Sequence, residues 1–128
     1  MNFIKKKVIL AIVASAIFAL SSTVYAKATG EDKVTDAAEN TVAKVEEALT
    51  LVEQGADKEA IVKAINDARQ IQKLWRYELT ERQRERENNK LRIARDAFQK
   101  GESQPAEATL REALAGFKEM KTLYDKNH

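Results

Sequence analysis

Apolar residues recur along this chain at alternating spacings of four and three positions, and this pattern constrains the fold more than any other feature. Within residues 34–54 the pattern is carried by Ala38, Val42, Val45, Leu49 and Val52. Such spacing places the apolar side chains on one narrow stripe of an α-helix. Because a helix of this kind must bury its stripe against another helix, the sequence predicts an all-α protein of packed helices.

Glycines divide the helical sequence into segments. Gly55 and Gly101 each follow an alanine-rich stretch, and a glycine just past a helix end supplies the left-handed conformation of a C-cap. Asp57 is a good N-cap after the first glycine, whereas Ser103 and Pro105 suit a helix start after the second. The sequence therefore predicts four helices, over about residues 34–54, 57–79, 81–100 and 104–126.

The join between the second and third helices has three interpretations. Thr80 and Gln83 fit the two ends of a capping box, with Thr80 as the N-cap of the third helix. Residues 81–90 contain no apolar side chain, however, so a helix that starts there has nothing to bury. The second helix could instead continue to a break at residues 88–89, or a single helix could cover residues 57–100. We favour the break near Thr80.

The two halves of the chain resemble each other at an offset of 46 residues. The pairs that match in kind are Lys44/Lys90, Ala48/Ala94, Val52/Phe98, Gly55/Gly101, Ala60/Ala106, Ala64/Leu110, Ala68/Leu114, Ile71/Phe117 and Leu74/Met120. Each half is a helix, a glycine turn and a second helix, and such a hairpin cannot bury its stripe alone. We expect two antiparallel hairpins that form a four-helix bundle over residues 34–128, with a homodimer left open.

Residues 1–26 have the layout of a secretory signal peptide. Three lysines at 5–7 precede an apolar run over residues 8–20, and small residues lead up to Ala26. The run is shorter than the roughly 20 residues that span a bilayer. We therefore expect cleavage after Ala26, a periplasmic location and no stable membrane insertion. The polar residues 27–33 are expected to form a flexible leader.

The composition excludes several classes of function. The chain has no cysteine and one histidine, His128, so disulfides, thiol chemistry, histidine-dependent triads and covalently bound haem are ruled out. No carboxylate pair falls on an apolar face, where its pKa would rise, so we expect neither an enzyme nor a bound cofactor. Of the 22 basic residues, removal of the three lysines at 5–7 leaves 19, which nearly balance the 20 acidic residues. A near-neutral chain has no electrostatic basis for binding nucleic acid.

Acidic residues lie beside the first apolar stripe at every seventh position, at Asp32, Glu39, Glu46 and Glu53. One interpretation is that they form ion pairs between helices and select which helices pack together. The other is that carboxylate oxygens bind a hard divalent cation. Because seven helical residues rise roughly 10.5 Å, one ion would need ligands from different helices. The candidate metal ligands are Glu46, Glu47, Glu53 and Asp57.

The middle of the chain is rich in basic residues. Residues 82–95 have two interpretations. They form a basic face that binds anionic lipid or an acidic client protein, or they form a solvated face whose glutamates pair with neighbouring arginines. Trp75 is either a core residue or, if residues 81–90 leave it uncovered, part of an exposed apolar patch that marks an interaction site. The candidate partner-binding residues are Trp75, Tyr77, Arg82 and Arg86.

The layout of a signal peptide followed by two glycine-turned, alanine-rich hairpins resembles the periplasmic small metal-binding protein family. The resemblance covers most of residues 27–128 and is closest at Ala48, Gly55, Ala60, Ala64 and Ala68. Members are four-helix bundles that scavenge divalent metals such as copper and nickel through many histidines. The resemblance implies the fold, but this chain has other residues, Lys63 and Ala64 among them, where that family has histidines, so no ligand residues are carried over.

Residues 79–83 (LTERQ) resemble the LTxxQ motif of the Spy/CpxP envelope-stress chaperones, and the motif occurs once here. Those chaperones are small all-helical periplasmic dimers that hold unfolded client proteins. Residue patterns and resemblances together predict a non-enzymatic exported binding protein that takes up divalent metal through carboxylates. The alternative is a Spy/CpxP-like chaperone or protein-interaction module.

Overall fold

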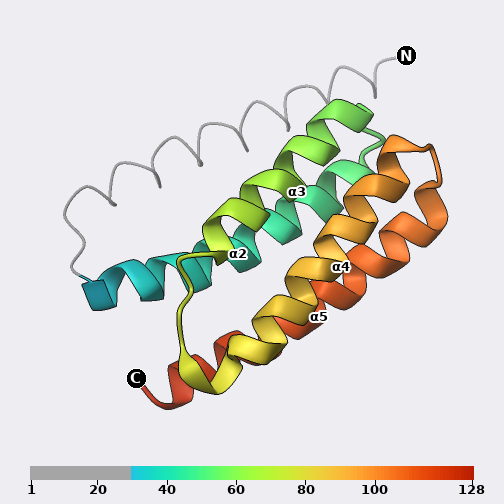
Figure 1. Ribbon diagram of the computed structural model, residues 1–128. Helices are drawn as coiled ribbons and strands as arrows, with labels where there is room; N and C mark the ends of the chain where they lie inside the picture. Colours follow the sequence, from blue (N-terminus) through green and yellow to red (C-terminus); the bar gives the residue numbers. More distant parts are fainter. Residues whose placement is uncertain (1–29) are drawn as a thin grey trace. The chain divides into compact units, whose positions relative to one another are not determined.

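The computed structural model describes residues 30–128, so the expected signal peptide and the first part of the leader lie outside the described residues. Its helices are α2 (Gly30–Glu53), α3 (Lys58–Gln72), the short 3₁₀ helix η2 (Glu78–Thr80), α4 (Glu81–Gln99) and α5 (Ser103–Lys126). Residues 30–128 contain no β-strand, and the four α-helices pack together (Figure 1). The predicted all-α four-helix bundle is confirmed.

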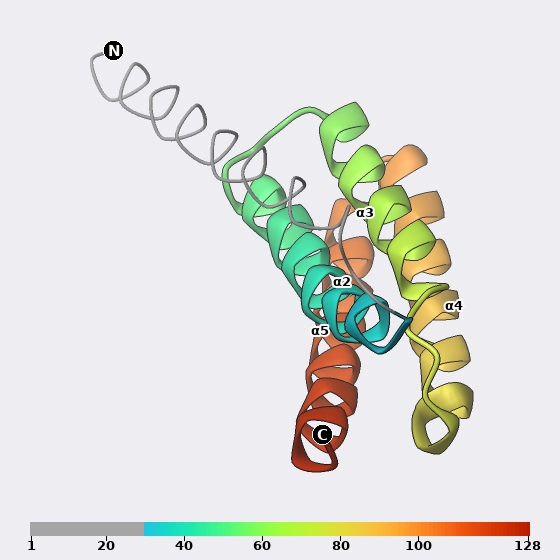
Figure 2. The ribbon, with the colours of Figure 1, turned by 90° about the vertical axis from the view of Figure 1, so that its left-hand side faces the viewer.

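Residues Val34–His128 form one compact unit. Short turns join α2 to α3 and α4 to α5, so each pair is an antiparallel hairpin (Figures 1 and 2). The hairpins meet where α3 packs on α4 and where ion pairs link α2 to α5. None of the helices within residues 30–128 combines the length and apolar character that a membrane span requires.

The two glycine turns have the same geometry. Gly55 has φ +71° and Gly101 has φ +82°, as predicted for C-cap glycines. One residue further on, the Ala56 N–H donates to the Leu51 carbonyl and the Glu102 N–H donates to the Ala97 carbonyl, both at 2.9 Å. These bonds satisfy carbonyls that the helix end would otherwise leave free. The equivalent turns of the two hairpins therefore lie at the offset of 46 residues found in the sequence.

The helix starts differ in detail from the prediction. Asp57 occupies the N-cap position of α3, but its side chain makes no capping bond; its carbonyl accepts the Ile61 N–H at 3.1 Å. Ser103, expected at the start of the fourth helix, is the first residue of α5, and Glu102 is its N-cap residue. Residues 30–33, expected in a flexible leader, begin α2. An acidic residue in a first helical turn, such as Asp32, is favourable beside the helix dipole.

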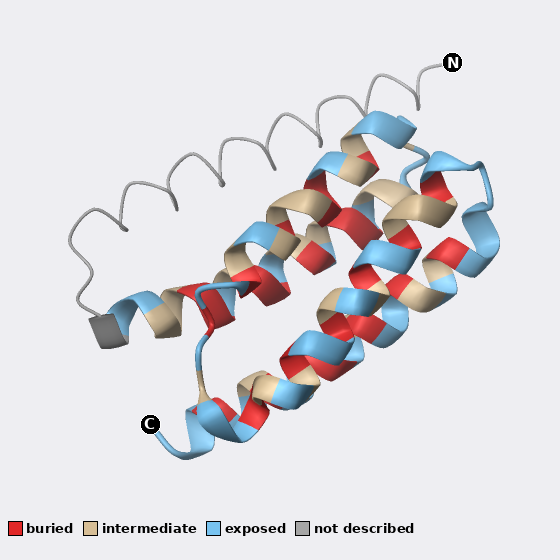
Figure 3. Cartoon of the chain, viewed as in Figure 1, coloured by how far each residue is buried: buried red, intermediate tan, exposed pale blue. Residues whose placement is uncertain are grey.

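The apolar stripes of the four helices meet in one core (Figure 3). Its largest fully buried apolar side chains are Ile65, Trp75, Leu91, Leu110, Phe117, Met120 and Tyr124. Small residues alternate with these, because Ala48, Ala68, Ala94 and Ala113 are also fully buried and let the helices approach closely.

The second predicted helix ends earlier than expected. α3 stops at Gln72 and not at residue 79, and residues 73–80 form a connector to α4 that includes η2. The Trp75 N–H donates to the Gln72 carbonyl at 3.0 Å, and the backbone then becomes extended at Tyr77. The connector places Trp75 in the core, where it stacks on Phe117 at a ring distance of 6.0 Å, whereas Leu74 faces solvent. Leu74 therefore differs from Met120, its match in the other half of the chain, which is buried. The continuous helix over residues 57–100 is also excluded.

Replacing Gly55 by alanine tests the turn geometry. We expect Gly55→Ala to lower the free energy of unfolding by about 1–2 kcal/mol, because a Cβ at φ +71° is strained. No atom lies within 4 Å of the added Cβ, so backbone strain alone is measured. Urea unfolding provides the measurement, and Gly55→Asn is the matched control with a smaller expected loss. A Gly55→Ala variant as stable as the wild type would contradict this turn.

Candidate functional site: the connector between α3 and α4

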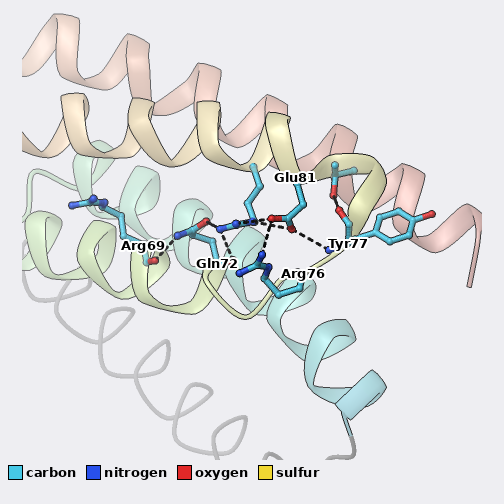
Figure 4. A network of polar contacts seen from close by, with 7 residues as sticks. Arg69, Gln72, Arg76, Tyr77 and Glu81 are labelled. Atoms are coloured by element: carbon cyan, nitrogen blue, oxygen red, sulfur yellow. Dashed lines mark hydrogen bonds and ion pairs between the residues drawn. The ribbon is translucent and has the colours of Figure 1, made fainter.

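The connector is held by a buried arginine, Arg84, on the first turns of α4. Its Nη1 donates to Gln72 Oε1 at 2.7 Å, and its Nη2 donates to Glu81 Oε1 at 2.9 Å. Gln72 is also buried, and its Nε2 donates to the Arg69 carbonyl at 2.8 Å. One guanidinium therefore joins Gln72 on the last turn of α3 to Glu81 on the first turn of α4, two residues labelled in Figure 4.

Glu81 extends this network into the connector. Its Oε2 accepts the Tyr77 N–H at 3.2 Å, and its Oε1 lies 3.2 Å from Arg76 Nη2 (Figure 4). The pKa of the Glu81 carboxyl is lowered, chiefly by the hydrogen bond from Arg84 and further by the charge of Arg84 and the Tyr77 N–H. Glu81 therefore carries its negative charge inside a set of donors that fix the connector backbone.

The predicted capping box does not form. The Thr80 hydroxyl donates back to the Tyr77 carbonyl at 3.3 Å, and Gln83 Nε2 donates to the Gly116 carbonyl on α5 at 3.2 Å. The position of Thr80 as the residue before α4 is nevertheless correct. The reason for the difference is the 3₁₀ turn at residues 78–80, which brings the Thr80 hydroxyl over the Tyr77 carbonyl.

Aromatic rings attach the connector to the end of α5. The Tyr77 ring meets the Tyr124 ring edge to face at 5.4 Å, and the Tyr124 hydroxyl lies 2.8 Å from Thr35 Oγ1 on α2. The His128 ring stacks on Tyr124 at 3.8 Å. Aromatic pairs of this geometry stabilise by about 0.5–1.5 kcal/mol beyond the area they bury. Tyr77 is therefore half-buried and serves to position the connector.

The connector and the first turns of α4 carry exposed apolar and basic side chains. Leu74 is 59% exposed and Leu79 is 67% exposed, the two highest values among the large apolar residues described in residues 32–128. Basic side chains lie on the same segment and on the first turns of α4. We call the following set the connector surface: Lys73, Leu74, Arg76, Leu79, Arg82 and Arg86.

The four predicted partner-binding residues are thus divided by the structure. Arg82 and Arg86 are exposed on α4 beside the connector, as a binding role requires, and Tyr77 is half-buried. Trp75 is fully buried, so of its two interpretations the core residue is correct. The exposed apolar side chains belong to Leu74 and Leu79, which the sequence alone did not single out.

Two buried polar residues were also missed, because residues 81–90 were expected to have nothing to bury. Arg84 and Glu87 are both buried in α4. Glu87 packs directly against Gly116 of α5, where any side chain would collide with its carboxylate, and Lys90 Nζ lies 3.3 Å from Glu87 Oε1. The signal was present in the spacing: the stripe of Leu91, Ala94 and Phe98, extended backwards, reaches both residues.

The four candidate metal ligands are not brought together. Glu46 Oε2 lies 3.3 Å from Lys118 Nζ, and Glu53 Oε2 lies 3.1 Å from Arg111 Nη2, both across to α5. Glu47 pairs with Lys44 on its own helix, and Asp57 stands exposed at the start of α3. Within residues 30–128 no three carboxylate or imidazole side chains are placed to hold one metal ion. For Glu46 and Glu53, the interpretation as ion pairs between helices is confirmed.

Comparisons with known proteins add no relative to this description. No protein-family model, no curated protein and no solved structure matches the chain. The function must therefore be argued from the connector and its surroundings.

The role of Arg84 can be tested by removing its charge. We expect Arg84→Met to lower the free energy of unfolding by about 2–3 kcal/mol, because Gln72 and Glu81 lose a buried donor. The matched control is Arg82→Met on the exposed side of the same turn, with an expected change within about 0.5 kcal/mol. Equal losses in the two variants, measured by urea unfolding, would show that the network does not hold the connector.

The lowered pKa of Glu81 predicts a dependence of stability on pH. A carboxyl whose pKa is depressed by folding stabilises the native state above its ordinary pKa of 4.5, and this stabilisation is lost as the pH falls through the native pKa. We therefore expect Glu81→Gln to be less stable than the wild type at neutral pH and to lose less stability on acidification. Glu78→Gln, an exposed neighbour, is the control. Parallel unfolding midpoints for wild type and Glu81→Gln across the acid range would refute this prediction.

Proposed function

We propose that this chain is a non-enzymatic binding protein that is exported to the periplasm and engages another protein through the connector surface. The observation that carries the proposal is the exposure of Leu74 and Leu79 on one connector. Burying a leucine stabilises by about 1.5–3 kcal/mol, so two exposed leucines in a small domain represent a gain that folding leaves unused. A partner that covers these two leucines would obtain this free energy of burial on binding.

The order of the connector also favours binding. Its backbone is held by Glu81, its Tyr77 ring packs on Tyr124, and its Trp75 ring is anchored in the core. A partner therefore meets leucines on a segment whose conformation is already fixed. Binding to an ordered segment avoids much of the entropy loss that a flexible loop would undergo.

The resemblance to the Spy/CpxP motif is consistent with this proposal. The motif residues Leu79, Thr80 and Gln83 lie at the end of the connector and the start of α4, and Leu79 belongs to the connector surface. Metal uptake, by contrast, has less support, because Glu46 and Glu53 already pair with basic residues of α5. We therefore place protein binding ahead of divalent metal binding.

A permanently unfolded, fluorescently labelled client protein tests the proposal. We expect the protein purified from the periplasm of an expressing bacterium to bind this client, with Leu79→Ser weakening the Kd about tenfold, since a lost leucine contact is worth roughly 1.4 kcal/mol or more. Fluorescence anisotropy provides the Kd. The control is Leu123→Ser, which changes an exposed leucine of α5 outside the connector surface. The proposal fails if the wild type does not bind, or if both serine variants weaken binding equally.

A further inference from the structure

We infer that the partner of the connector surface is a protein segment that is acidic as well as apolar, with Asp or Glu side chains next to leucine-like ones. This inference rests on the proposed function and specifies the chemistry of the partner. It is argued from the charges that surround Leu74 and Leu79, from their internal partners and from the distribution of carboxylates among them.

The basic side chains of the connector surface form few or long ion pairs and hydrogen bonds within the described residues. Arg82 is exposed and has no ion pair or hydrogen bond from its side chain within residues 30–128. Arg86 is exposed, and its Nε lies 3.7 Å from the buried Glu87 Oε2. Among the described residues, Lys73 Nζ contacts only the neutral amide oxygen of Gln70, to which it donates at 3.3 Å. Arg76 pairs with Glu81, but two thirds of its side chain is exposed.

Two basic residues of α5, Arg111 and Lys121, show the contrast. Arg111 bonds to both Glu107 and Glu53, at 2.6 and 3.1 Å. Lys121 Nζ lies 2.6 Å from Asp125 Oδ2. These cations have full carboxylate partners on the surface, so they have little to offer an incoming anion. The cations beside the exposed leucines keep donors available.

The carboxylates of the same segment do not neutralise this surface. Residues 73–86 contain Glu78, Glu81 and Glu85, and Glu81 is already committed to Arg84 and the Tyr77 N–H. Glu78 and Glu85 are exposed and form no ion pair within residues 30–128. The connector surface carries four exposed cations, of which Arg76 and Arg86 each have one ion-pair contact with a glutamate. A partner carboxylate can form paired hydrogen bonds with an arginine fork, a geometry that favours binding over simple screening.

The interleaved glutamates favour a protein segment over a membrane. An anionic bilayer presents a continuous negative plane, which would meet Glu78 and Glu85 at the same time as the arginines. A protein segment carries discrete charges, so it can place carboxylates opposite Arg82 and Arg86 and avoid the glutamates. Its apolar side chains would then cover Leu74 and Leu79.

The test uses three synthetic peptides that differ only in charge, in which leucine alternates with glutamate, glutamine or lysine. Binding to the full exported protein is measured by fluorescence anisotropy at low salt. We expect the glutamate peptide to bind about tenfold more tightly than the glutamine peptide, and added salt to remove most of this difference. We expect Arg82→Glu to weaken the glutamate peptide and to strengthen the lysine peptide.

The matched control is Lys100→Glu at the exposed C-cap of α4, which should leave the order of the three peptides unchanged. Both charge variants should show wild-type unfolding, because a carboxylate at position 82 also lies in a favourable place near the start of α4. If Arg82→Glu, but not Lys100→Glu, changes the preference from the glutamate peptide to the lysine peptide, the peptide carboxylates bind at the connector surface.

The outcomes separate this inference from the proposed function. If the glutamate and glutamine peptides bind equally and Arg82→Glu alters neither, the acidic preference is wrong although protein binding through the leucines stands. If no peptide binds and Leu79→Ser leaves client binding unchanged, the proposed function itself is wrong. If vesicles of anionic phospholipid bind more tightly than the glutamate peptide, and Arg82→Glu abolishes that binding, the ligand is a membrane and the inference is overturned.

Discussion

The connection between α3 and α4 depends on the buried guanidinium of Arg84, which lies between the ends of these two helices. Removing a charged group from water costs several kcal/mol unless it is fully paired, so Arg84 can be buried only where its partners meet it. Those partners are Gln72, on the last turn of α3, and Glu81, on the first turn of α4. The connector, residues 73–80, runs between these two partners along a path that the bond from the Tyr77 N–H to Glu81 helps to fix. That path directs Trp75 into the core and leaves Leu74 and Leu79 outside.

The sequence was sufficient to predict the parts of the fold that depend on local pattern. Apolar spacing identified the four helices, and Gly55 and Gly101 identified both hairpin turns, because a left-handed backbone conformation has a strong residue preference. The end of α3 could not be predicted in this way. The stripe of Ile61, Ala64 and Ala68 continues in phase to Trp75, so periodicity alone favours a longer helix. The helix ends at Gln72, whose side chain contacts Arg84 of another helix, and such a contact cannot be read from periodicity.

The candidate site shows the same division. Arg82 and Arg86 could be selected as exposed basic residues, whereas Arg84 could not be distinguished from them without following the apolar stripe backwards through a polar segment. The expected metal ligands fail for a related reason. A stripe of carboxylates on α2 does not reveal what faces it, and in the bundle α5 presents Lys118 and Arg111 to Glu46 and Glu53. Charge patterns along one helix need the packing of its neighbours before they can be assigned to a ligand.

The position of the only tryptophan is the most direct test of this account. Trp75 is fully buried against Phe117 because the connector leaves the helix after Gln72. The account predicts blue-shifted tryptophan fluorescence and weak quenching by acrylamide in the native protein, with both properties lost on unfolding in urea. Native emission and quenching equal to those of the unfolded chain would contradict the path of the connector and, with it, the surface that the connector presents.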